Sequence, residues 1–421
     1  QIEIDDRRPH HNIKFTEVTE DTFAHILWPK GHPAEGQPIK IRDYQVEAVK
    51  TALDQERTLL LSPTASGKSF IIYTIMRYHV ANKRKCIIIV PTTSLVEQLF
   101  ADFEDYSSAN GWKPSYHCQK LYSGFTKDFT KDVLITTWQS VYLQPKIWFQ
   151  NFDVIFGDEA HQFKAKSLTT ILSGCTNTKY RIGTTGTLDG TQTHRLVLEG
   201  LFGPVYKATS TAELIDKGQL ASFKIKCLVL KYPDPICKEA RSWDYNNEMD
   251  YIVGNKARNE FIRNLTLSLT GNSLVLFQFV EKHGKQLHEI IKDSAGKRKV
   301  FFVFGGTDVE VRESVRAITE RENDAIIVAS YGTFSTGVNI RNLHNIIFAS
   351  PSKSRVRNLQ SIGRGLRLGE NKEEATLFDI ADDFRIGKFA NYTLKHFVER
   401  VKIYDEEKFN YKFYNIELKN A

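Results

Sequence analysis

Short runs of β-branched and other apolar residues alternate with longer segments whose apolar positions recur at helical spacing, from about Ile39 to Pro204. Runs of the first kind are typical of strands buried on both faces, and segments of the second kind are typical of amphipathic helices. The expected strands are Thr58–Ser62, Cys86–Val90, Val133–Thr137, Val154–Gly157 and Tyr180–Thr184, and the expected helices include Lys68–Val80 and Ser94–Tyr106. Strands that alternate with helices predict an α/β fold with a doubly wound parallel sheet.

The same alternation resumes after a break near Gly200–Pro204. The strands expected there are Ser273–Phe277, Val300–Phe304, Ala325–Ala329, Ile346–Ala349 and Ala375–Asp379, and the helices are Asn255–Leu269, Gly284–Lys292, Val309–Glu322 and Ser354–Ile362. The chain therefore predicts two tandem α/β domains, residues 39–210 and 223–421, the second with a C-terminal helix, joined by a linker at 211–222. Lys231–Asn247, with two prolines, is expected as a loop or an inserted element, and residues 1–38 have no assignable role.

Length and composition agree with this division. A chain of 421 residues suits two or three domains. Apolar runs of about five residues are far shorter than the roughly twenty of a membrane-spanning helix, so we expect no membrane association and a cytoplasmic location. The five cysteines form no C-x-x-C pair, so neither structural zinc nor a disulfide framework is expected. The net charge of +7 permits a polyanionic partner without requiring one.

A glycine–lysine–serine loop lies between an expected strand and an expected helix. Backbone N–H groups in such a turn, together with the helix N-terminus, favour phosphate binding. Lys68 can reach the terminal phosphates, and the Ser69 hydroxyl can hold Mg²⁺. The residues of this loop that would contact the nucleotide are Thr64, Ala65, Ser66, Gly67, Lys68 and Ser69, while Ser62 stands where a glycine is usual. The alternative is an ordinary strand-to-helix turn.

An acidic pair follows the expected strand Val154–Gly157. Carboxylates at the carboxyl end of a strand lie at the sheet edge where α/β proteins bind ligands. Asp158 would hold Mg²⁺, and Glu159 would polarise the attacking water as a general base. The alternative is two solvated loop carboxylates. With Lys68 in the same domain, the pair predicts a nucleoside triphosphatase.

Two arginines of the second domain, Arg364 and Arg367, are three residues apart and would share a face of a helix. We interpret them as arginine fingers that reach the γ-phosphate across a cleft between the two domains, where their fixed positive charge stabilises the charge that develops during hydrolysis. The alternative is a pair of surface arginines in salt bridges.

The order of these motifs resembles that of superfamily 2 helicases. The resemblance rests on Tyr44-Gln45, Gly67-Lys68-Ser69, Pro91-Thr92, Asp158-Glu159-Ala160-His161, Thr185-Gly186-Thr187, Ser335-Thr336-Gly337 and Gln360 with Arg364 and Arg367. Within that superfamily, Thr64–Ser69, Thr137-Trp138-Gln139, Ser330–Gly337 and Asp405–Tyr411 resemble the UvsW helicases of large tailed phages.

This resemblance implies two RecA-like domains with the ATP site in the cleft between them, a DEAH-box-like acidic motif, and ATP with Mg²⁺ as cofactors. It also implies an ATP-dependent DNA helicase that unwinds or remodels forks, Holliday junctions and R-loops without sequence specificity, in recombination, repair and rescue of replication forks. The partners would be branched DNA and RNA–DNA hybrids, and the location the host cytoplasm. Thr185-Gly186-Thr187 in place of Ser-Ala-Thr, and Asn339 in place of an aspartate, depart from the superfamily pattern.

The resemblance also assigns ligand contacts. Gln45 would read the adenine edge with its amide and Arg42 would stack on the base, which favours ATP over GTP. Gly337, Asn339 and Gln360 would contact the nucleotide from the second domain. A helix-start glutamine in solvent is the alternative for Gln45.

Nucleic-acid contacts are implied in both domains. In the first they are Pro91, Thr92, Thr93, Ser123, Gly124, Thr136 and Thr137, and in the second Gln278, Ser335 and Thr336, with Lys353, Arg355 and Arg357 as an electrostatic track. A solvated helix face is the alternative for the basic run. Trp138, Phe334, Phe125 and Phe129 could stack on bases, although aromatic residues beside strands more often belong to a core.

Three other activities share these motifs in whole or in part. An RNA helicase would use every one of them. A motor of a restriction or remodelling complex would translocate without separating strands. A binding module with a degenerate ATP site is disfavoured because Lys68, Asp158, Glu159, Arg364 and Arg367 are all present.

Overall fold

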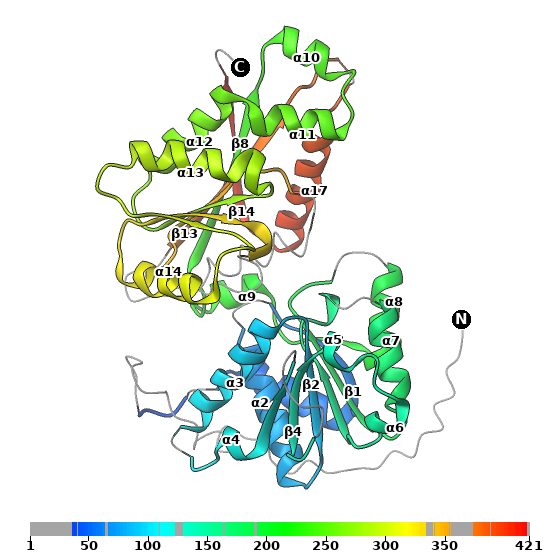
Figure 1. Cartoon of the computed structure of the whole chain (residues 1–421). Coiled ribbons are helices and arrows are strands. Elements are labelled where there is room, and N and C mark those ends of the chain that lie inside the picture. The colour runs from blue at the N-terminus through cyan, green and yellow to red at the C-terminus, as the bar shows by residue number, and fades with distance from the viewer. Residues whose placement is uncertain are drawn as a thin grey trace. The chain divides into compact units, whose positions relative to one another are not determined.

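The computed structural model describes residues 36–39, 41–63, 66–108, 110–122, 129–162, 165–188, 192–333, 340, 342–352, 354, 374–387 and 389–418. These residues form two compact units, each an α/β layer structure (Figure 1). The first contains the described residues up to Leu61, Gly67–Thr185 and Leu196–Ala208. The second contains Ser62–Ser66, Gly186–Arg195 and the chain from Thr209 onward.

The first unit holds a sheet of seven parallel strands in the order β3-β4-β2-β5-β6-β1-β7. The strands are β1 (Arg57–Leu61), β2 (Cys86–Val90), β3 (Cys118–Leu121), β4 (Val133–Thr137), β5 (Val154–Gly157), β6 (Tyr180–Thr185) and β7 (Val205–Lys207). The helices are α1 (Asp43–Gln55), α2 (Lys68–Ala81), α3 (Thr93–Ser107), α4 (Pro114–His117), α5 (Trp138–Val141), α6 (Lys146–Phe149), α7 (Ala165–Gly174) and α8 (Gln192–Phe202), with a 3₁₀ turn at Ala160–Gln162.

Apolar side chains on both faces explain why this sheet is buried. Alternate strand residues such as Ile88 and Phe156 join the core formed with α1, α2 and α3. The opposite face receives α8, whose Phe202 ring fills the space above Gly157 and Gly183, where any larger residue would clash with it. Strands covered on both faces are the reason that their sequences read as continuous apolar runs.

The second unit repeats this architecture with the strand order β10-β11-β9-β12-β13-β8-β14, again all parallel. The strands are β8 (Ser222–Lys231), β9 (Ser273–Phe277), β10 (Val300–Val303), β11 (Ile326–Ser330), β12 (Asn345–Phe348), β13 (Glu374–Asp383) and β14 (Asn410–Glu417). The helices are α9 (Thr211–Asp216), α10 (Asp234–Ala240), α11 (Tyr245–Gly254), α12 (Lys256–Ser268), α13 (Lys285–Ser294), α14 (Val309–Arg321) and α17 (Tyr392–Glu406), with a π-helical turn at Val280–Gly284.

Strand β13 carries a buried carboxylate on each face of this sheet. Asp382 accepts two hydrogen bonds from Arg258 of α12, at 2.7 and 3.0 Å, and both side chains are fully buried. On the other face, Asp379 accepts hydrogen bonds from Arg400 and Tyr404 of α17. Because a buried charge is costly unless it is paired, each bidentate pair fixes one helix to the central part of the sheet.

The predicted fold class is confirmed, since both units are doubly wound parallel sheets. The strands Cys86–Val90, Val133–Thr137, Val154–Gly157 and Ser273–Phe277 have the predicted bounds. The segment 231–247 is helical over α10 and the start of α11, and the expected linker 211–222 contains α9. The C-terminal helix, α17, is followed by a strand, β14. No helix in the described part of the chain is both long and apolar enough to cross a membrane.

Candidate active site

Three neighbouring strands of the first sheet, β5, β6 and β1, carry the candidate catalytic residues at their carboxyl ends. The strands are adjacent in this order and parallel, so the segments that follow them meet at one edge. The phosphate loop follows β1, Asp158 and Glu159 follow β5, and Thr185 ends β6. This edge is where a doubly wound sheet ordinarily binds its ligand.

The turn between β1 and α2 is organised by two serine hydroxyls and one glycine. The Ser62 and Ser66 hydroxyls are 2.6 Å apart, and the Ser66 hydroxyl also donates to the Pro63 carbonyl at 2.6 Å. Gly67 begins α2 with φ of 83°, a left-handed conformation that favours glycine. Ser62 thus gives the turn a side-chain hydrogen bond that the usual glycine lacks. Thr64 and Ala65 lie outside the described residues.

Gln45 of α1 lies directly against this turn. A Cβ atom added to Gly67 would clash with the Gln45 Nε2 atom. The Gln45 Oε1 atom accepts a hydrogen bond of 3.1 Å from the Arg42 backbone, and the Arg42 side chain donates to the Tyr44 hydroxyl at 3.0 Å. The structure therefore brings Gln45 and the phosphate turn together, as the proposed adenine contact requires.

Lys68 and Glu159 form an ion pair at this edge. The Lys68 Nζ atom is 3.5 Å from Glu159 Oε1, and the two side chains are 12% and 17% exposed. Glu159 has a φ of 50°, which is uncommon for a residue with a side chain and costs on the order of 1 kcal/mol. Glu56, Lys83 and Lys408 also have a positive φ, so this feature marks the site only together with the ion pair.

Asp158 is buried beside this ion pair. Its Oδ1 atom accepts hydrogen bonds from the Thr184 hydroxyl at 2.7 Å and from the Glu159 backbone at 2.9 Å. Burial and, less strongly, the charge of Glu159 raise the pKa of the Asp158 carboxyl to about 6, against the opposing effects of Lys68 and of the two hydrogen bonds. Burial is therefore the main reason that this carboxyl resists ionisation in the folded protein.

The donor set suits Mg²⁺. Magnesium prefers oxygen ligands and usually binds through one or two carboxylates together with substrate phosphates. Asp158 and Ser69 offer such oxygens, and the raised pKa of Asp158 marks a place where a cation would be stabilised. The Ser69 hydroxyl is 2.9 Å from the Tyr106 hydroxyl. The described residues contain no group of three or more His, Cys, Asp or Glu side chains that could hold a metal without such help.

Sequence reasoning gave no role to three residues at this edge: Thr184, Tyr106 and His161. His161 Nδ1 is 2.6 Å from the Thr185 hydroxyl and 3.4 Å from Glu159 Oε2, so it connects the ends of β5 and β6. His161 was visible within the acidic motif, but the contacts of Tyr106 and Thr184 depend on neighbours far along the chain.

The predicted nucleic-acid contacts of the first unit differ in accessibility. Thr93 is exposed at the start of α3, while the Thr92 hydroxyl accepts from the Leu95 backbone at 3.4 Å and Pro91 is buried. The Thr136 hydroxyl is fully buried and donates to the Leu121 carbonyl at 2.7 Å, so it reaches a ligand only if that bond breaks. The Thr137 hydroxyl is 2.9 Å from that of Ser140.

In the second unit, Gln278 is exposed directly after β9, where its backbone N–H donates to the Ser350 hydroxyl at 3.1 Å. Among the aromatic candidates, the Phe129 ring packs 4.8 Å from Phe152 and the Trp138 ring 5.7 Å from Tyr142. Other candidates lie outside the described residues: Ser123, Gly124, Phe125, Phe334, Ser335, Thr336, Gly337, Asn339, Lys353, Arg355, Arg357, Gln360, Arg364 and Arg367.

Comparisons with known proteins identify the family of this chain. The family described as "Type III restriction enzyme, res subunit" matches residues 38–190, and "Helicase conserved C-terminal domain" matches residues 257–369. The ATP-dependent DNA helicase UvsW of Enterobacteria phage T4 is 36% identical over 393 residues, which cover 89% of this chain and 77% of the relative. The chain belongs to the UvsW helicase family. As a member of this superfamily 2 family, it is an ATP-hydrolysing helicase, and the resemblance noted in its motifs is confirmed.

More distant relatives of this UvsW-family helicase share its fold. The DNA 3'-5' translocase XPB2 of Sulfurisphaera tokodaii is 24% identical and is matched over 91% of both chains. A solved fragment described as an HsdR subunit of a type I restriction enzyme from Vibrio vulnificus has a TM-score of 0.65 at 16% identity, covering 89% of this chain and 68% of that one. At this identity, the likeness shows the tandem RecA-like fold alone.

Proposed function

We propose that this UvsW-family helicase uses ATP hydrolysis to unwind and remodel branched DNA, namely forks, Holliday junctions and R-loops, without sequence specificity. Such an activity would serve recombination, repair and the rescue of stalled replication forks. The observation that carries the catalytic part is the Lys68–Glu159 ion pair beside the buried Asp158 at the carboxyl edge of the first sheet. The choice of DNA rests on the relative from phage T4, which is named as a DNA helicase.

The nucleotide would change the partners of Lys68. Its ammonium group would leave Glu159 for the β- and γ-phosphates, whose charge is larger and which accept strong charge-assisted hydrogen bonds. Glu159 would then be available to accept a proton from the attacking water. Ser69 and Asp158 would hold Mg²⁺, which when bound neutralises charge on the phosphate oxygens. Gln45 and Arg42 would select adenine, and the turn residues Thr64, Ala65, Ser66 and Gly67 would surround the phosphates with backbone N–H groups.

The second domain would complete the reaction. Arg364 and Arg367 would stabilise the transition state, and Gly337, Asn339 and Gln360 would contact the bound nucleotide. The match of residues 257–369 to the helicase C-terminal family supports these assignments, because all five residues lie within it, although Asn339 stands where an aspartate is usual. Catalysis that needs groups from two domains couples hydrolysis to domain movement, which is the basis of translocation.

DNA would lie against the strand ends of both sheets. Backbone amides, hydroxyls and helix N-termini suit phosphate contacts, which fix the register of the strand without reading its sequence. The accessible positions Thr93 and Gln278 are the strongest candidates among the described residues. Thr92 caps α3 and the buried Thr136 supports β4 against β3, so both would position the backbone rather than contact DNA through their hydroxyls.

An unwinding panel tests this proposal. A fork, a four-way junction, an R-loop and an RNA duplex of matched length and sequence would be incubated with ATP and Mg²⁺, and strand release followed on native gels. Release from the three branched substrates, together with little release from the RNA duplex and none by Lys68→Ala, is expected. Equal activity on the RNA duplex would instead identify an RNA helicase.

Translocation without strand separation is a second candidate. It is favoured by the match of residues 38–190 to the restriction-enzyme family and by the relative named as a DNA translocase. Displacement of a triplex-forming strand without release of strands from a fork would identify this activity.

A further inference from the structure

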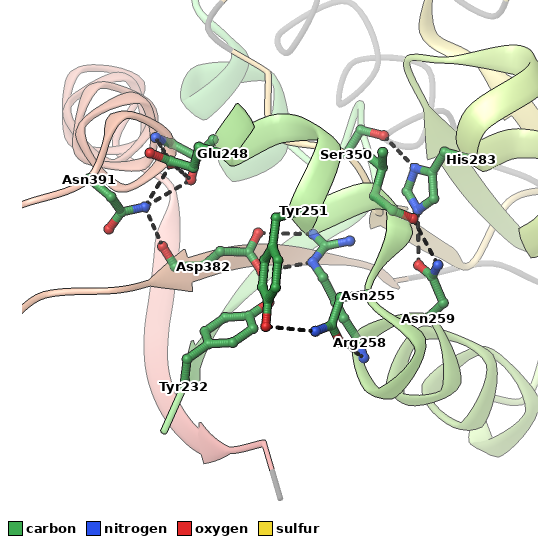
Figure 2. A network of polar contacts seen from close by, with 12 residues as sticks. Tyr232, Glu248, Tyr251, Asn255, Arg258, Asn259, His283, Ser350, Asp382 and Asn391 are labelled. Carbon is green, nitrogen blue, oxygen red and sulfur yellow. Dashed lines mark hydrogen bonds and ion pairs between the residues drawn. The ribbon is translucent and has the colours of Figure 1, made fainter. Parts of the chain in front are cut away.

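A chain of buried hydrogen bonds connects helix α12 to the carboxyl edge of the second sheet. It runs through Asn259, His283 and Ser350 (Figure 2). It ends at the backbone of Gln278. Asn259, His283 and Ser350 are each at most 1% exposed. A buried polar network stabilises a single geometry when every donor meets an acceptor, and it destabilises the fold when one is left unpaired. The donor and the acceptor of each hydrogen bond therefore have to be assigned.

The Val253 carbonyl orients the Asn259 amide and thereby sets the donor and acceptor of each later hydrogen bond in the chain. The Asn259 Nδ2 atom donates to the Val253 carbonyl at 2.9 Å, which orients the amide, and its Oδ1 atom therefore faces His283 Nε2 at 3.1 Å. His283 must then carry its proton on Nε2 and accept at Nδ1. The Ser350 hydroxyl, 2.8 Å from Nδ1, donates to it, which leaves the oxygen of Ser350 to accept from the Gln278 backbone at 3.1 Å.

His283 is held neutral in this position. Burial and, less strongly, the charge of Arg258 lower the pKa of His283 to about 3. Because the neutral ring has one donor and one acceptor, it can satisfy Asn259 and Ser350 at the same time. A charged imidazolium would have two donors and would turn the Ser350 hydroxyl away from it.

Ser350 also joins other segments at this edge. It follows β12, and its hydroxyl holds the residue after β9, while its carbonyl accepts from the Tyr331 hydroxyl at 3.0 Å directly after β11. Three adjacent strands, β11, β9 and β12, are thus tied together at their carboxyl ends. Within this edge, the Gln278 side chain is exposed, while its backbone N–H is held by the buried Ser350 hydroxyl.

We propose that His283 and Ser350 are positioning residues that hold Gln278 and the end of β12 in the geometry required for nucleic-acid binding. This inference rests on the proposed function, which places DNA at this edge. Neither side chain touches the ligand. They act by keeping the strand ends in one conformation before binding, which lowers the entropy that is lost when DNA binds.

The test separates positioning from general stability by choosing variants that keep or remove one hydrogen bond. Ser350→Ala removes the hydroxyl that joins Gln278 to His283. His283→Asn keeps an acceptor near the Nδ1 position, whereas His283→Gln places its amide near Nε2 and loses the contact to Ser350. Ser352→Ala is the matched control, because Ser352 is a buried serine of the same segment whose hydroxyl makes no hydrogen bond within the described structure.

Each purified full-length variant would be compared by its melting temperature, its KM for ATP, and the concentration of single-stranded DNA that gives half-maximal ATPase stimulation. Ser350→Ala and His283→Gln should raise that DNA concentration about tenfold, the change that 1.4 kcal/mol produces. Ser352→Ala and His283→Asn should stay within about threefold of the wild type. The KM for ATP should stay within about twofold throughout, because the nucleotide contacts are elsewhere.

Two results would overturn the inference. One is a Ser350→Ala protein with wild-type dependence on DNA, and the other is an equal loss in His283→Asn and His283→Gln, which would indicate a structural role only. Gln278→Ala tests separately the assumption that DNA contacts this edge. If that variant binds DNA normally, DNA does not contact this edge and the proposed interface fails. If it binds poorly while Ser350→Ala binds normally, the positioning role alone fails.

Discussion

Replacing Asp158 by asparagine should stabilise the first unit while abolishing ATP hydrolysis. The carboxylate is buried, and its Oδ1 atom accepts hydrogen bonds from Thr184 and from the backbone of Glu159. Asparagine can accept both bonds with its own Oδ1 atom, so the substitution removes the charge with little change in shape. The protein without ligand would no longer carry a charge that burial disfavours, whereas the enzyme would lose an expected Mg²⁺ ligand.

The size of the stabilisation follows from the pKa of Asp158. The pKa rises from 3.8 to about 6, and each unit corresponds to about 1.36 kcal/mol, so ionisation costs the folded state about 3 kcal/mol at neutral pH. Because the folded pKa is the higher one, this cost is absent below pH 3.8, grows between 3.8 and 6, and is complete above 6. Asp158→Asn should therefore gain about 3 kcal/mol at pH 7.5 and roughly half of that at pH 5.

Urea unfolding in the presence of EDTA measures this difference. Four of the five tryptophans precede residue 150, so their fluorescence mainly follows the first unit. Asp54→Asn, at an exposed position of α1, is the matched control and should unfold as the wild type does at both pH values. An Asp158→Asn protein no more stable than the wild type at pH 7.5, or a gain that does not shrink at pH 5, would refute the reasoning.

Three further predictions concern the nucleotide site and the stability of the first unit. Lys68→Ala should abolish ATP turnover in a phosphate-release assay but keep DNA affinity at low salt; normal turnover would exclude Lys68 as the phosphate ligand. Arg367→Ala should bind a fluorescent ATP analogue normally while hydrolysis falls by about 10³-fold or more; normal hydrolysis would mean that this arginine does not act on the γ-phosphate. Burial and Arg84 lower the pKa of His79 to about 3, so between pH 7 and pH 5 the histidine takes up a proton in the unfolded state only, which destabilises the fold. The free energy of unfolding of His79→Gln should therefore fall by about 2 kcal/mol less than that of the wild type over this pH range. An equal loss in both proteins, measured by urea unfolding, would contradict this.

The central strands could be predicted from sequence because they are covered on both faces. Cys86–Val90 is apolar at every position and fully buried, so the run has no competing interpretation. β8 was missed because its first half is not a continuous apolar run: exposed Lys224 and Lys226 alternate with buried Phe223, Ile225 and Cys227. β14 has no fully buried position, and its apolar residues Tyr411, Phe413, Tyr414 and Ile416 are interrupted by polar ones, so they form no continuous apolar run.

In the candidate site, residues that belong to short motifs could be predicted, whereas partners far along the chain could not. Lys68, Asp158 and Glu159 could be predicted because strand, turn and charge are encoded within a few residues of each, and the structure places Lys68 and Glu159 in contact. The partners that tune them could not be predicted, since Thr184 is 26 residues from Asp158 and Tyr106 is 37 residues from Ser69. Only the folded sheet decides which distant hydroxyl meets which charged or metal-binding group.

The two sheets differ in how their buried carboxylates are paired. In the second, Asp379 and Asp382 each form an ion pair with a buried arginine, and His283 remains uncharged. In the first, Lys68 forms an ion pair with Glu159, and burial raises the pKa of the neighbouring Asp158. Bound Mg²⁺ would favour the ionised form of Asp158, and a triphosphate would compete with Glu159 for Lys68. Nucleotide binding at the first edge would thus stabilise a carboxylate whose ionised form burial disfavours.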